Sequence, residues 1–410
     1  CEAQSLNILF LSRWFPFPAN NGSKLRIANL LRQLGRNHQV DLVSFTAREE
    51  PSDMDGAGSV CRSVAVVPYL PYQPNQPRAL TGLFSMEPRS VQATFSDAFQ
   101  MEVDRRVTLS EPDLVIASQI DMIPYVRSRW GIPAILEEVE LTTLYEQHSA
   151  ARTSLARLRY GLTWTKLRRY LASVLPRFAA CTAASSQELA LIREAVPGYR
   201  GHLGVVPNGV DLHHYAADYG PYQPESIVYS GAVTYAANRD AVDYFATQIL
   251  PSVRAAVPNV AFTVTGSTGN VPVAALEAQA GVRFSGYLDD IRPLLAQSAV
   301  SVIPLRIGGG TRLKLLESAA LGTPVVATRK GAEGIDFVAE RDILIADDAV
   351  DFGRAVIRVL TDPALRTALG RSAQNAVARY DWTQVAEQLL RLVDTVVAEG
   401  SRSRLAGERV

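Results

Sequence analysis

Residues 7–46 read NILFLSRWFPFPANNGSKLRIANLLRQLGRNHQVDLVSFT. Two short apolar runs of strand length, residues 7–12 and 39–46, flank a Pro/Asn/Gly loop and a segment with helical periodicity. We expect Ser23 to cap that helix. Its apolar positions are Leu25, Ala28, Leu31 and Leu34. Strand, loop, helix and strand in this order predict a βαβ unit, and the parallel sheet it implies is covered on both faces.

The same kind of pattern continues along the chain and then begins again. After a turn-rich link near residue 220, a second series of strands and helices follows. The further strands expected in the first half are residues 113–118, 133–138 and 179–185. Those expected in the second half are residues 226–232, 260–267, 282–288 and 300–305, with helices at 238–257, 349–360, 363–379 and 382–398. The sequence therefore predicts an α/β protein with two halves.

Composition limits the possible functions. The chain has 410 residues, which favours two domains, and 47% of them are hydrophobic, as is typical of a globular protein. Its net charge is zero, which argues against a general nucleic-acid binder. The three cysteines Cys1, Cys61 and Cys181 have neither disulfide-framework nor zinc-site spacing, so we expect a reducing compartment. An initial Cys indicates trimming or numbering from an internal position, with a lipoprotein as the alternative.

Two segments, residues 47–60 and 68–78, are rich in Pro, Gly, Ser, Asp and Asn and are predicted to be mobile loops. The DMD sequence at 53–55 resembles an Asp-x-Asp metal pair, but a solvated loop explains it more simply.

A glycine-rich stretch, GGGTRLKLLESAALG at 308–322, follows the strand expected at 300–305. Glycines allow close approach of a ligand to the backbone, and the N-terminus of a helix starting near Thr311 attracts anions. Arg312 and Lys314 in a first helical turn oppose the helix dipole unless an anion binds them. Glu317 lies among apolar neighbours and needs hydrogen-bond donors. This pattern predicts a diphosphate site with Glu317 on a ribose. The alternatives for Glu317 are an ion pair with Lys314 and a buried acid whose hydrogen bonds are satisfied within the protein.

Other common catalytic motifs are missing from the sequence. It has no G-x-G-x-x-G after either first strand, no P-loop, no G-x-S-x-G and no H-E-x-x-H. We therefore do not expect a dinucleotide dehydrogenase, a P-loop NTPase, a serine hydrolase or a zinc protease, and we expect no metal and no cofactor.

With these segments in place, the chain resembles the family 4 glycosyltransferases, which are retaining enzymes of the GT-B fold. PLRIGGGTRLKLLESAALGTPVVATRKGAEGI is similar to their donor-binding segment, in the form with GGGTR. The resemblance also covers residues 8–34, VVPNGVD, GAVTYAANRDAVDYF and residues 282–305. It implies two Rossmann-like domains facing across a cleft. The implied boundaries are 1–203, with a crossover helix at 382–398, for the acceptor domain and 204–381 for the nucleotide-sugar donor domain.

The resemblance also implies the donor site. Glu317 matches the family's ribose-binding acid, whereas Gly309 replaces the acid that often contacts the donor sugar. The segment AVTYAAN lacks the Arg and Lys that many relatives carry after the first strand of the second domain, so the source of positive charge is open. The candidate donor-binding residues are Gly22, Gly231, Arg306, Gly308, Gly309, Gly310, Thr311, Arg312, Leu313, Lys314 and Glu317.

At the reacting end, many relatives have a His where this chain has Ser118 and Gln119. The acids Glu137, Glu138 and Glu140 follow the next strand, and Glu138 and Glu140 should share one strand face. Three acids at one strand end cannot all be buried and ionised without donors or cations. Our candidate catalytic residues are Glu140, Glu138 and Gln119, and the alternative is a solvated acidic loop.

Residues 151–177 contain seven basic residues and no acid. An apolar stripe of Trp164, Leu167, Tyr170 and Leu171 could contact an anionic membrane or a lipid-linked acceptor, or it could pack inside its own domain.

We thus predict a retaining, metal-independent transferase that moves a sugar from a nucleotide-diphosphate-sugar to a hydroxyl acceptor, either lipid-linked or a glycan. Its role would be in polysaccharide, glycolipid or glycoconjugate synthesis. Its expected place is the cytoplasm or the inner membrane face, and nucleic acid is not an expected partner. The alternatives are a nucleotide-sugar 2-epimerase of the same fold and a non-catalytic nucleotide-sugar or glycan-binding module.

Overall fold

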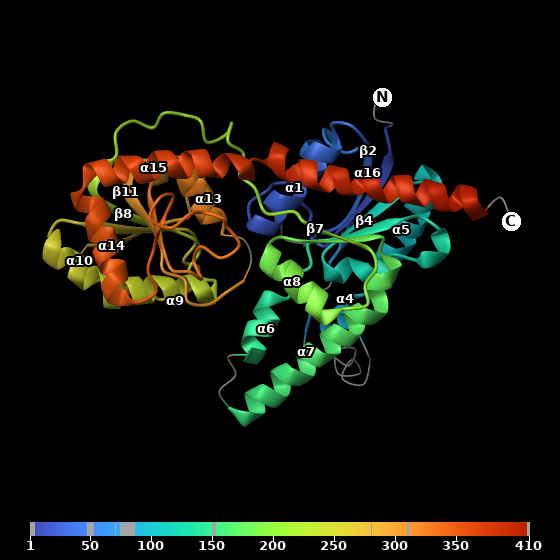
Figure 1. Ribbon diagram of the computed structural model, residues 1–410, viewed down its shortest axis with the longest axis horizontal. Coiled ribbons are helices and arrows are strands. Elements are labelled where there is room, and N and C mark those ends of the chain that lie inside the picture. The colour runs from blue at the N-terminus through green and yellow to red at the C-terminus, as the bar shows by residue number, and fades with distance from the viewer. Residues whose placement is uncertain are drawn as a thin grey trace. The chain divides into compact units, whose positions relative to one another are not determined.

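A computed structural model describes residues 5–46, 53–69, 71–73, 87–149, 153–279, 281–309 and 312–407, with side chains to residue 402. The chain divides into two compact units: Cys1–Asn208 with Trp382–Val410, and Gly209–Asp381. Each unit has its own parallel sheet covered by helices (Figure 1). The predicted α/β class with two parallel sheets is confirmed.

The first unit contains a seven-stranded sheet in the order β3-β2-β1-β4-β5-β6-β7, and every neighbouring pair is parallel. In chain order the strands are β1 (Asn7–Ser12), β2 (Gln39–Thr46), β3 (Ser63–Pro68), β4 (Leu114–Ser118), β5 (Ala134–Glu137), β6 (Ala180–Ala183) and β7 (His202–Val205). Successive residues of a strand point to opposite faces, so each face has a separate core. Ile8 and Phe10 of β1 lie in one core, and Leu9 and Leu11 lie in the other.

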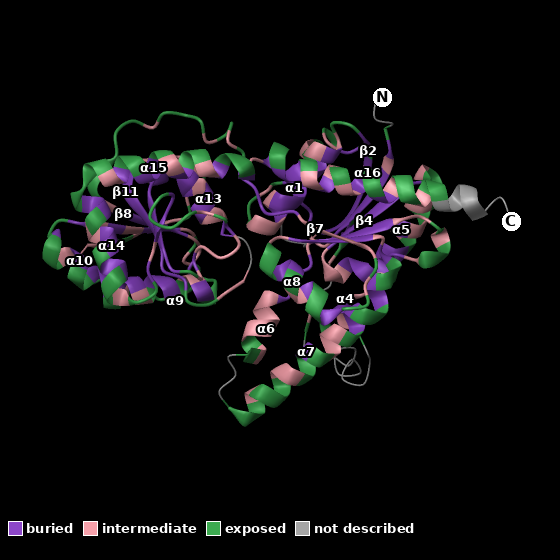
Figure 2. Cartoon of the chain, viewed as in Figure 1, coloured by how far each residue is buried: buried purple, intermediate pink, exposed green. Residues whose placement is uncertain are grey.

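Helices cover both faces of this sheet, whose five inner strands are almost entirely buried (Figure 2). The helices are α1 (Gly22–Leu34), α2 (Met54–Gly58), α4 (Arg89–Thr94), α5 (Asp97–Ser110), α6 (Thr142–Ser149), α7 (Ser154–Val174), α8 (Ser186–Ala195) and α16 (Trp382–Gly407). Short 3₁₀ turns add η1 (Ile120–Tyr125), η2 (Ser128–Trp130) and η3 (Leu175–Arg177). Helices α1 and α16 contribute to the core around Ile8, and α5, α7 and α8 contribute to the core around Leu9. No helix of the described part is both long and apolar enough to span a membrane.

Two local predictions in this unit are wrong. Asn21, not Ser23, caps α1, because its side-chain oxygen accepts a hydrogen bond from the Lys24 amide at 3.0 Å. Part of the predicted loop at 47–60 is the short helix α2, and Asp53 is its cap through a 2.8 Å bond to the Gly56 amide. This cap explains the first aspartate of DMD without a metal. Residues 47–52 lie outside the described part.

The second unit has a six-stranded parallel sheet in the order β10-β9-β8-β11-β12-β13. The strands are β8 (Gln223–Ser230), β9 (Ala261–Thr265), β10 (Val282–Gly286), β11 (Ser298–Ile303), β12 (Val325–Ala327) and β13 (Leu344–Ile345). The helices are α9 (Ala236–Tyr244), a π-helical turn η4 (Phe245–Ile249), α10 (Leu250–Ala256), α11 (Ala274–Glu277), α12 (Arg292–Ala296), α13 (Leu313–Ala320), α14 (Ala349–Thr361), α15 (Pro363–Val377) and η5 (Ala378–Tyr380). The carboxyl ends of its parallel strands meet at one edge, where ligands bind in such sheets.

A buried ion pair connects three segments of the first unit. Arg26 of α1 is fully buried and donates from Nε to Oε1 of Glu137, the last residue of β5, at 2.7 Å. The same guanidinium donates to the Val206 carbonyl at 2.8 Å, the Pro207 carbonyl at 3.1 Å and Asn208 Oδ1 at 3.0 Å. A charge removed from water requires such a complete set of partners.

Replacing Arg26 tests this pair. Arg26→Met leaves Glu137 as an unpaired buried charge and should lower the free energy of unfolding of the first unit by about 3–5 kcal/mol. Arg36→Met, at an exposed arginine just beyond the end of α1, is the control and should change it by less than about 0.5 kcal/mol. The double change Arg26→Met with Glu137→Leu should regain part of the loss. Urea unfolding measures all three, and equal midpoints for Arg26→Met and the control would contradict the role of the pair.

Candidate functional site

The glycine-rich stretch lies between β11 and α13, at the carboxyl edge of the second sheet. Helix α13 begins at Leu313, so the predicted start near Thr311 is wrong by two residues. Gly308 has a φ of 104°, and a Cβ there would lie 3.0 Å from the Ala237 side chain. A side chain at this position would therefore be strained and crowded. Gly309 lies in the described part of the loop, whereas Gly310 and Thr311 lie outside it.

Arg312 is directed at the protein's own backbone. Its buried guanidinium donates to the carbonyls of Gly308 and Gly309, each at 2.7 Å, and of Lys330 at 3.0 Å. It also approaches Glu333 at 3.3 Å. These contacts hold the glycine loop in place. Arg312 thus positions the loop, and its charge is partly balanced by Glu333.

Lys314 crosses from the first turn of α13 to the loop after β8. Its Nζ donates to the Tyr229 hydroxyl and to Asn238 Oδ1, each at 2.9 Å. A Cβ at Gly231, whose φ is 149°, would lie only 2.8 Å from this Nζ. Glycine at 231 therefore leaves the space that Lys314 occupies. Among the described residues, no carboxylate forms an ion pair with Lys314. A cation held by neutral partners beside a glycine loop suits an anionic ligand.

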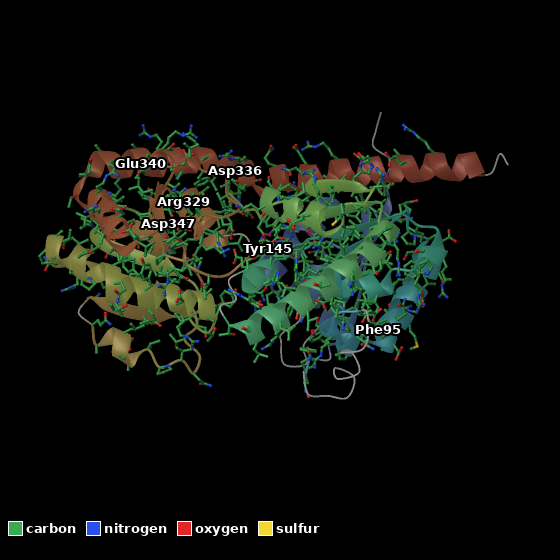
Figure 3. The ribbon with its side chains drawn as sticks, turned by 60° about the horizontal axis from the view of Figure 1, so that its bottom comes forward. Phe95, Tyr145, Arg329, Asp336, Glu340 and Asp347 are labelled. Carbon is green, nitrogen blue, oxygen red and sulfur yellow. The ribbon has the colours of Figure 1, made fainter. Side chains whose placement is uncertain are left out.

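The other cations near this edge are already paired with acids. Arg306 pairs with Asp240 at 2.5 Å and lies over the Tyr244 ring. Arg329, which follows β12, pairs with Asp347 at 2.9 Å, and both are labelled in Figure 3. Lys314 is thus the best placed of these candidates to supply the charge that the AVTYAAN segment lacks.

Burial makes the charge of Lys314 sensitive to its surroundings. Burial and the nearby Arg312 lower the pKa of Lys314 to about 7, while Glu317 acts in the opposite direction. An anion bound at Nζ would favour the charged form and raise this pKa. The lysine can therefore take up a proton when a phosphate binds.

Glu317 lies one turn further along α13 and is bound by a tyrosine. The Tyr215 hydroxyl donates to Glu317 Oε1 at 3.2 Å, and burial raises the pKa of Glu317. The alternative of an ion pair with Lys314 is not what the structure contains. Of the described residues, only Tyr215 donates to this carboxylate, so Oε2 can accept a hydrogen bond from a ligand hydroxyl.

The first unit presents a second cluster at the carboxyl ends of β4 and β5. Gln119 and Glu138 follow these strands with φ values of 72° and 56°, in the left-handed region that side chains rarely adopt. The Gln119 amide donates from Nε2 to Glu138 Oε2 at 3.1 Å. Strained residues of this kind concentrate at functional sites. The geometry thus brings two of the three candidate catalytic residues together.

The third candidate, Glu140, forms no hydrogen bond with Gln119 or Glu138 in the described part, although its charge adds to the rise in the pKa of Glu138. Strand β5 ends at Glu137, and the left-handed turn at Glu138 breaks the alternation that was expected to place Glu138 and Glu140 on one strand face. That prediction is wrong. Glu140 is exposed and accepts a hydrogen bond from the Thr143 hydroxyl at 2.8 Å.

Glu138 has an unusual charge balance. Only 16% of its side chain is exposed, and burial raises its pKa to about 7. The nearby Arg26, at 3.5 Å, opposes this rise, and repulsion from Glu137 adds to it. A carboxyl group that titrates near neutrality can exchange a proton or stabilise positive charge, as catalysis requires.

Two further predicted donor-binding residues lie at the starts of helices. Gly22 is the first residue of α1, and Leu313 is the first residue of α13. Among the described residues, no cluster of three His, Cys, Asp or Glu side chains could hold a metal ion.

Four contributing residues escaped prediction: Arg26, Tyr215, Tyr229 and Asn238. Asn238 lies in a segment that resembles the family and could have been found there. Arg26 likewise lies in the resembling stretch 8–34, whereas the two tyrosines carry no motif and join the site only through the fold.

Lys314 gives a prediction about proton uptake. At pH 8 most of this lysine should be neutral, so binding of UDP or GDP should draw a proton from the buffer. Calorimetry in buffers of different ionisation enthalpy measures this uptake. It should disappear in Lys314→Met and persist in Arg329→Met, the control. Unchanged uptake in Lys314→Met would show that Lys314 does not meet the phosphates.

Comparisons with known proteins place this geometry in context. Residues 21–209 match the family model described as glycosyl transferase 4-like domain, and residues 224–362 match the one described as glycosyl transferases group 1. The phosphatidyl-myo-inositol mannosyltransferase of Mycolicibacterium smegmatis is 29% identical over 59% of this chain and 62% of its own length. A lipopolysaccharide core biosynthesis glycosyltransferase, LpsE of Rhizobium meliloti, is 35% identical over 27% of this chain and 34% of its own length. The chain thus spans less than two thirds of the length of these relatives.

Solved structures agree on the fold. Sucrose-phosphate synthase from Thermosynechococcus elongatus has a TM-score of 0.68 at 17% identity, covering 96% of this chain and all of that one. The Anabaena protein HepE in complex with UDP-glucose has a TM-score of 0.63 at 16% identity, covering 95% of this chain and all of that one. The protein therefore has the GT-B fold and joins a domain of the glycosyl transferase 4-like family to one of the glycosyl transferases group 1 family.

Proposed function

We propose that this chain is a retaining glycosyltransferase that moves a sugar from a nucleotide-diphosphate-sugar to a hydroxyl acceptor. One observation carries the proposal: along one face of α13, Lys314 reaches the glycine at 231 and Glu317 follows one turn later with a free oxygen. A cation and an acceptor so spaced suit a diphosphate and the ribose attached to it. The two family matches and the UDP-glucose complex of HepE support the same reading.

The donor end would stabilise the leaving group. As the bond between the sugar and the diphosphate breaks, negative charge grows on the phosphate oxygens. Lys314, the N-terminus of α13 and the backbone of residues 308–309 would stabilise that charge, with Gly310, Thr311 and Gly22 as further proposed contacts. We propose that this arrangement needs no metal ion and no cofactor.

The acceptor end would lie in the first unit. The acceptor oxygen forms a bond to the sugar carbon on the face that the diphosphate leaves, and its proton passes to a phosphate oxygen of the leaving group. Glu138, oriented by Gln119, would stabilise the positive charge that develops on the sugar or orient the acceptor hydroxyl. Glu140 would act, if at all, from the exposed rim.

We place this activity in the synthesis of a glycolipid, polysaccharide or other glycoconjugate, at the cytoplasmic side of a membrane. Support comes from the relatives, since the mycobacterial proteins are named for a phosphatidyl-myo-inositol acceptor and the Rhizobium protein for lipopolysaccharide core biosynthesis. Residues 151–177 are proposed to face a lipid, as a membrane surface or as a lipid-linked acceptor. Trp164, Tyr170 and Leu171 of the stripe considered above are buried in their own unit, so any such contact must use other side chains.

Binding and turnover of UDP-, GDP- and ADP-sugars test the proposal. Calorimetry should find one nucleotide-diphosphate-sugar that binds, and Glu317→Ala should weaken it about 10- to 100-fold through the lost hydrogen bond to a charged group. Glu138→Gln should bind the donor as wild type does but transfer or hydrolyse it more slowly, and NMR of the product should show retention at the sugar carbon.

Two outcomes would contradict the proposal. If no nucleotide-sugar binds, or if Glu317→Ala binds the donor as tightly as wild type, α13 is not the nucleotide site. Donor binding without any turnover would favour a non-catalytic module instead. Glu277→Ala, at an acid on α11 outside the proposed site, is the matched control and should change neither quantity.

A further inference from the structure

A groove runs along α7 in the first unit, with a volume of about 1190 Å³. One wall is the face of α7 that carries Leu155, Leu158, Arg159, Leu162, Lys166 and Arg169. These positions are three or four residues apart, so they form one stripe on the helix. The opposite wall comes from residues 88–91 of α4 and the segment before it, Ile120 and Asp121 of η1, and Arg13.

The stripe differs from the one that the sequence suggested. Leu155, Leu158 and Leu162 are 78%, 61% and 63% exposed, so three large apolar side chains face solvent within two turns. A concentration of exposed leucines on one helix face is unusual for a surface that stays in water. Trp164 and Leu171 lie on the opposite face and fill the core of the unit.

The polar character of the groove increases along α7. The leucines lie toward its N-terminus, and Lys166 and Arg169 follow on the same stripe with Arg89 on the facing wall. Burial lowers the pKa of Lys166, and the positive charge of Arg89 adds to this effect, while the negative charge of Glu87 in the neighbouring pocket opposes it. Asp121, the only acid among the described residues of the lining, is paired with Arg13 at 2.6 Å. The groove therefore has an apolar end and an end with excess positive charge.

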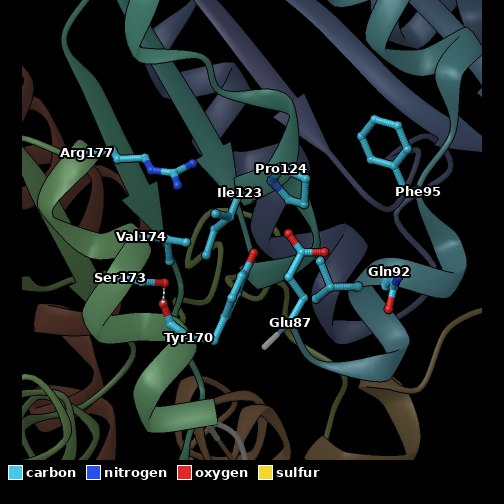
Figure 4. A pocket seen from close by; sticks show the side chains of 10 residues that line it. Glu87, Gln92, Phe95, Ile123, Pro124, Tyr170, Ser173, Val174 and Arg177 are labelled. Carbon is cyan, nitrogen blue, oxygen red and sulfur yellow. Dashed lines mark hydrogen bonds between the residues drawn. The ribbon is translucent and has the colours of Figure 1, made fainter. Parts of the chain in front are cut away.

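A smaller pocket of about 520 Å³ continues this trend on the next turns of α7 and shares Val91 with the groove. Its lining includes Glu87, Tyr170 and Arg177, whose side chains are drawn in Figure 4. Gln92, also in the lining, has a buried Oε1 without a hydrogen-bond donor. This pocket is thus suited to the polar end of a ligand.

The groove also lies close to the proposed reacting groups. Ile120 and Asp121 in its wall directly follow Gln119, which binds Glu138. Arg13 directly follows β1, the strand next to β4. A ligand in the groove therefore reaches the carboxyl edge of the sheet.

We propose that the groove binds an amphiphile with an anionic phosphate group, its apolar chain on Leu155, Leu158 and Leu162 and its phosphate near Arg89, Lys166 and Arg169. The assignment of this amphiphile as the acceptor rests on the proposed function, whereas its binding to the groove does not. The single molecule, rather than a membrane surface, is the proposed occupant, because the leucines and the cations face one hollow of molecular size.

Calorimetry with dodecyl phosphate, kept below its critical micelle concentration, tests this site on the full chain. We expect saturable binding that Leu158→Glu with Leu162→Glu weakens about tenfold or more, because two apolar contacts are lost and charge repulsion is added. Leu109→Glu, at a leucine of α5 that is 67% exposed and lies outside the groove, should bind like wild type. Lys166→Gln with Arg169→Gln should weaken dodecyl phosphate but not the neutral dodecyl maltoside, and Arg193→Gln on α8 is the control for that pair.

Several results would overturn the proposal. Equal binding of dodecyl phosphate by wild type and by the double glutamate variant would show that the groove is not the binding site. Inorganic phosphate that binds as tightly as dodecyl phosphate would indicate a simple anion site. Binding only to vesicles of anionic phospholipid would indicate a membrane surface, and a dimer that Leu158→Glu dissociates would indicate contact with a second copy.

Nucleotide binding separates this proposal from the previous one. If wild-type protein binds dodecyl phosphate but no nucleoside diphosphate, the proposed ligand site in the groove is supported and the proposed glycosyltransferase activity is refuted. If it binds a nucleoside diphosphate but no dodecyl phosphate, the proposed glycosyltransferase activity stands and the proposed ligand site in the groove is refuted. Unfolding curves of each variant show whether a loss of binding reflects a loss of folding.

Discussion

The buried ion pair between Arg26 and Glu137 sets the chemistry of the first unit. It joins the first helix, the end of β5 and the segment that leaves the sheet at residues 206–208. Ser118 completes it by donating to Glu137 Oε2 at 2.8 Å. A buried pair with all its partners is costly to disrupt. It holds the last residue of β5, and its two charges act in opposite directions on the pKa of the next residue, Glu138.

At the carboxyl edge of each sheet, burial and charged neighbours control the protonation of a single residue, Glu138 in the first unit and Lys314 in the second. In the first unit, burial and the anion at Glu137 make a second negative charge at Glu138 costly. In the second unit, burial and Arg312 make the positive charge of Lys314 costly. Both groups titrate near neutrality, and each would become fully charged when a ligand of opposite charge arrives. Neither effect requires a residue that a motif would reveal.

Sequence patterns predicted the two sheets because alternation and helical spacing record which residues are buried. The stretch at 7–46 and its counterpart at 226–257 are long and strongly periodic, so their elements were recognised. The left-handed turn at Glu138 was not, because it depends on contacts with Arg26 and Gln119, which are distant in the chain. For the same reason, two partners of Lys314 and Glu317, namely Tyr229 and Tyr215, emerged only from the fold.

Helix α7 shows a different limit. Its basic residues and an apolar stripe were visible, but composition alone does not say which face is buried. Trp164 and Leu171 pack in the core, whereas Leu155, Leu158 and Leu162 are exposed. The proposed binding face of α7 is therefore the one whose stripe has no aromatic residue.

The central claim is that burial, opposed by Arg26 and reinforced by Glu137, makes Glu138 titrate near neutrality. Carbon-13 NMR of protein labelled at the glutamate carboxyl carbon measures this directly, with Glu138→Gln to assign the signal. The account predicts a midpoint of about 7, which shifts upward in Arg26→Met because the opposing cation is lost. A midpoint near the ordinary value of about 4.3 for a glutamate in solution would contradict it.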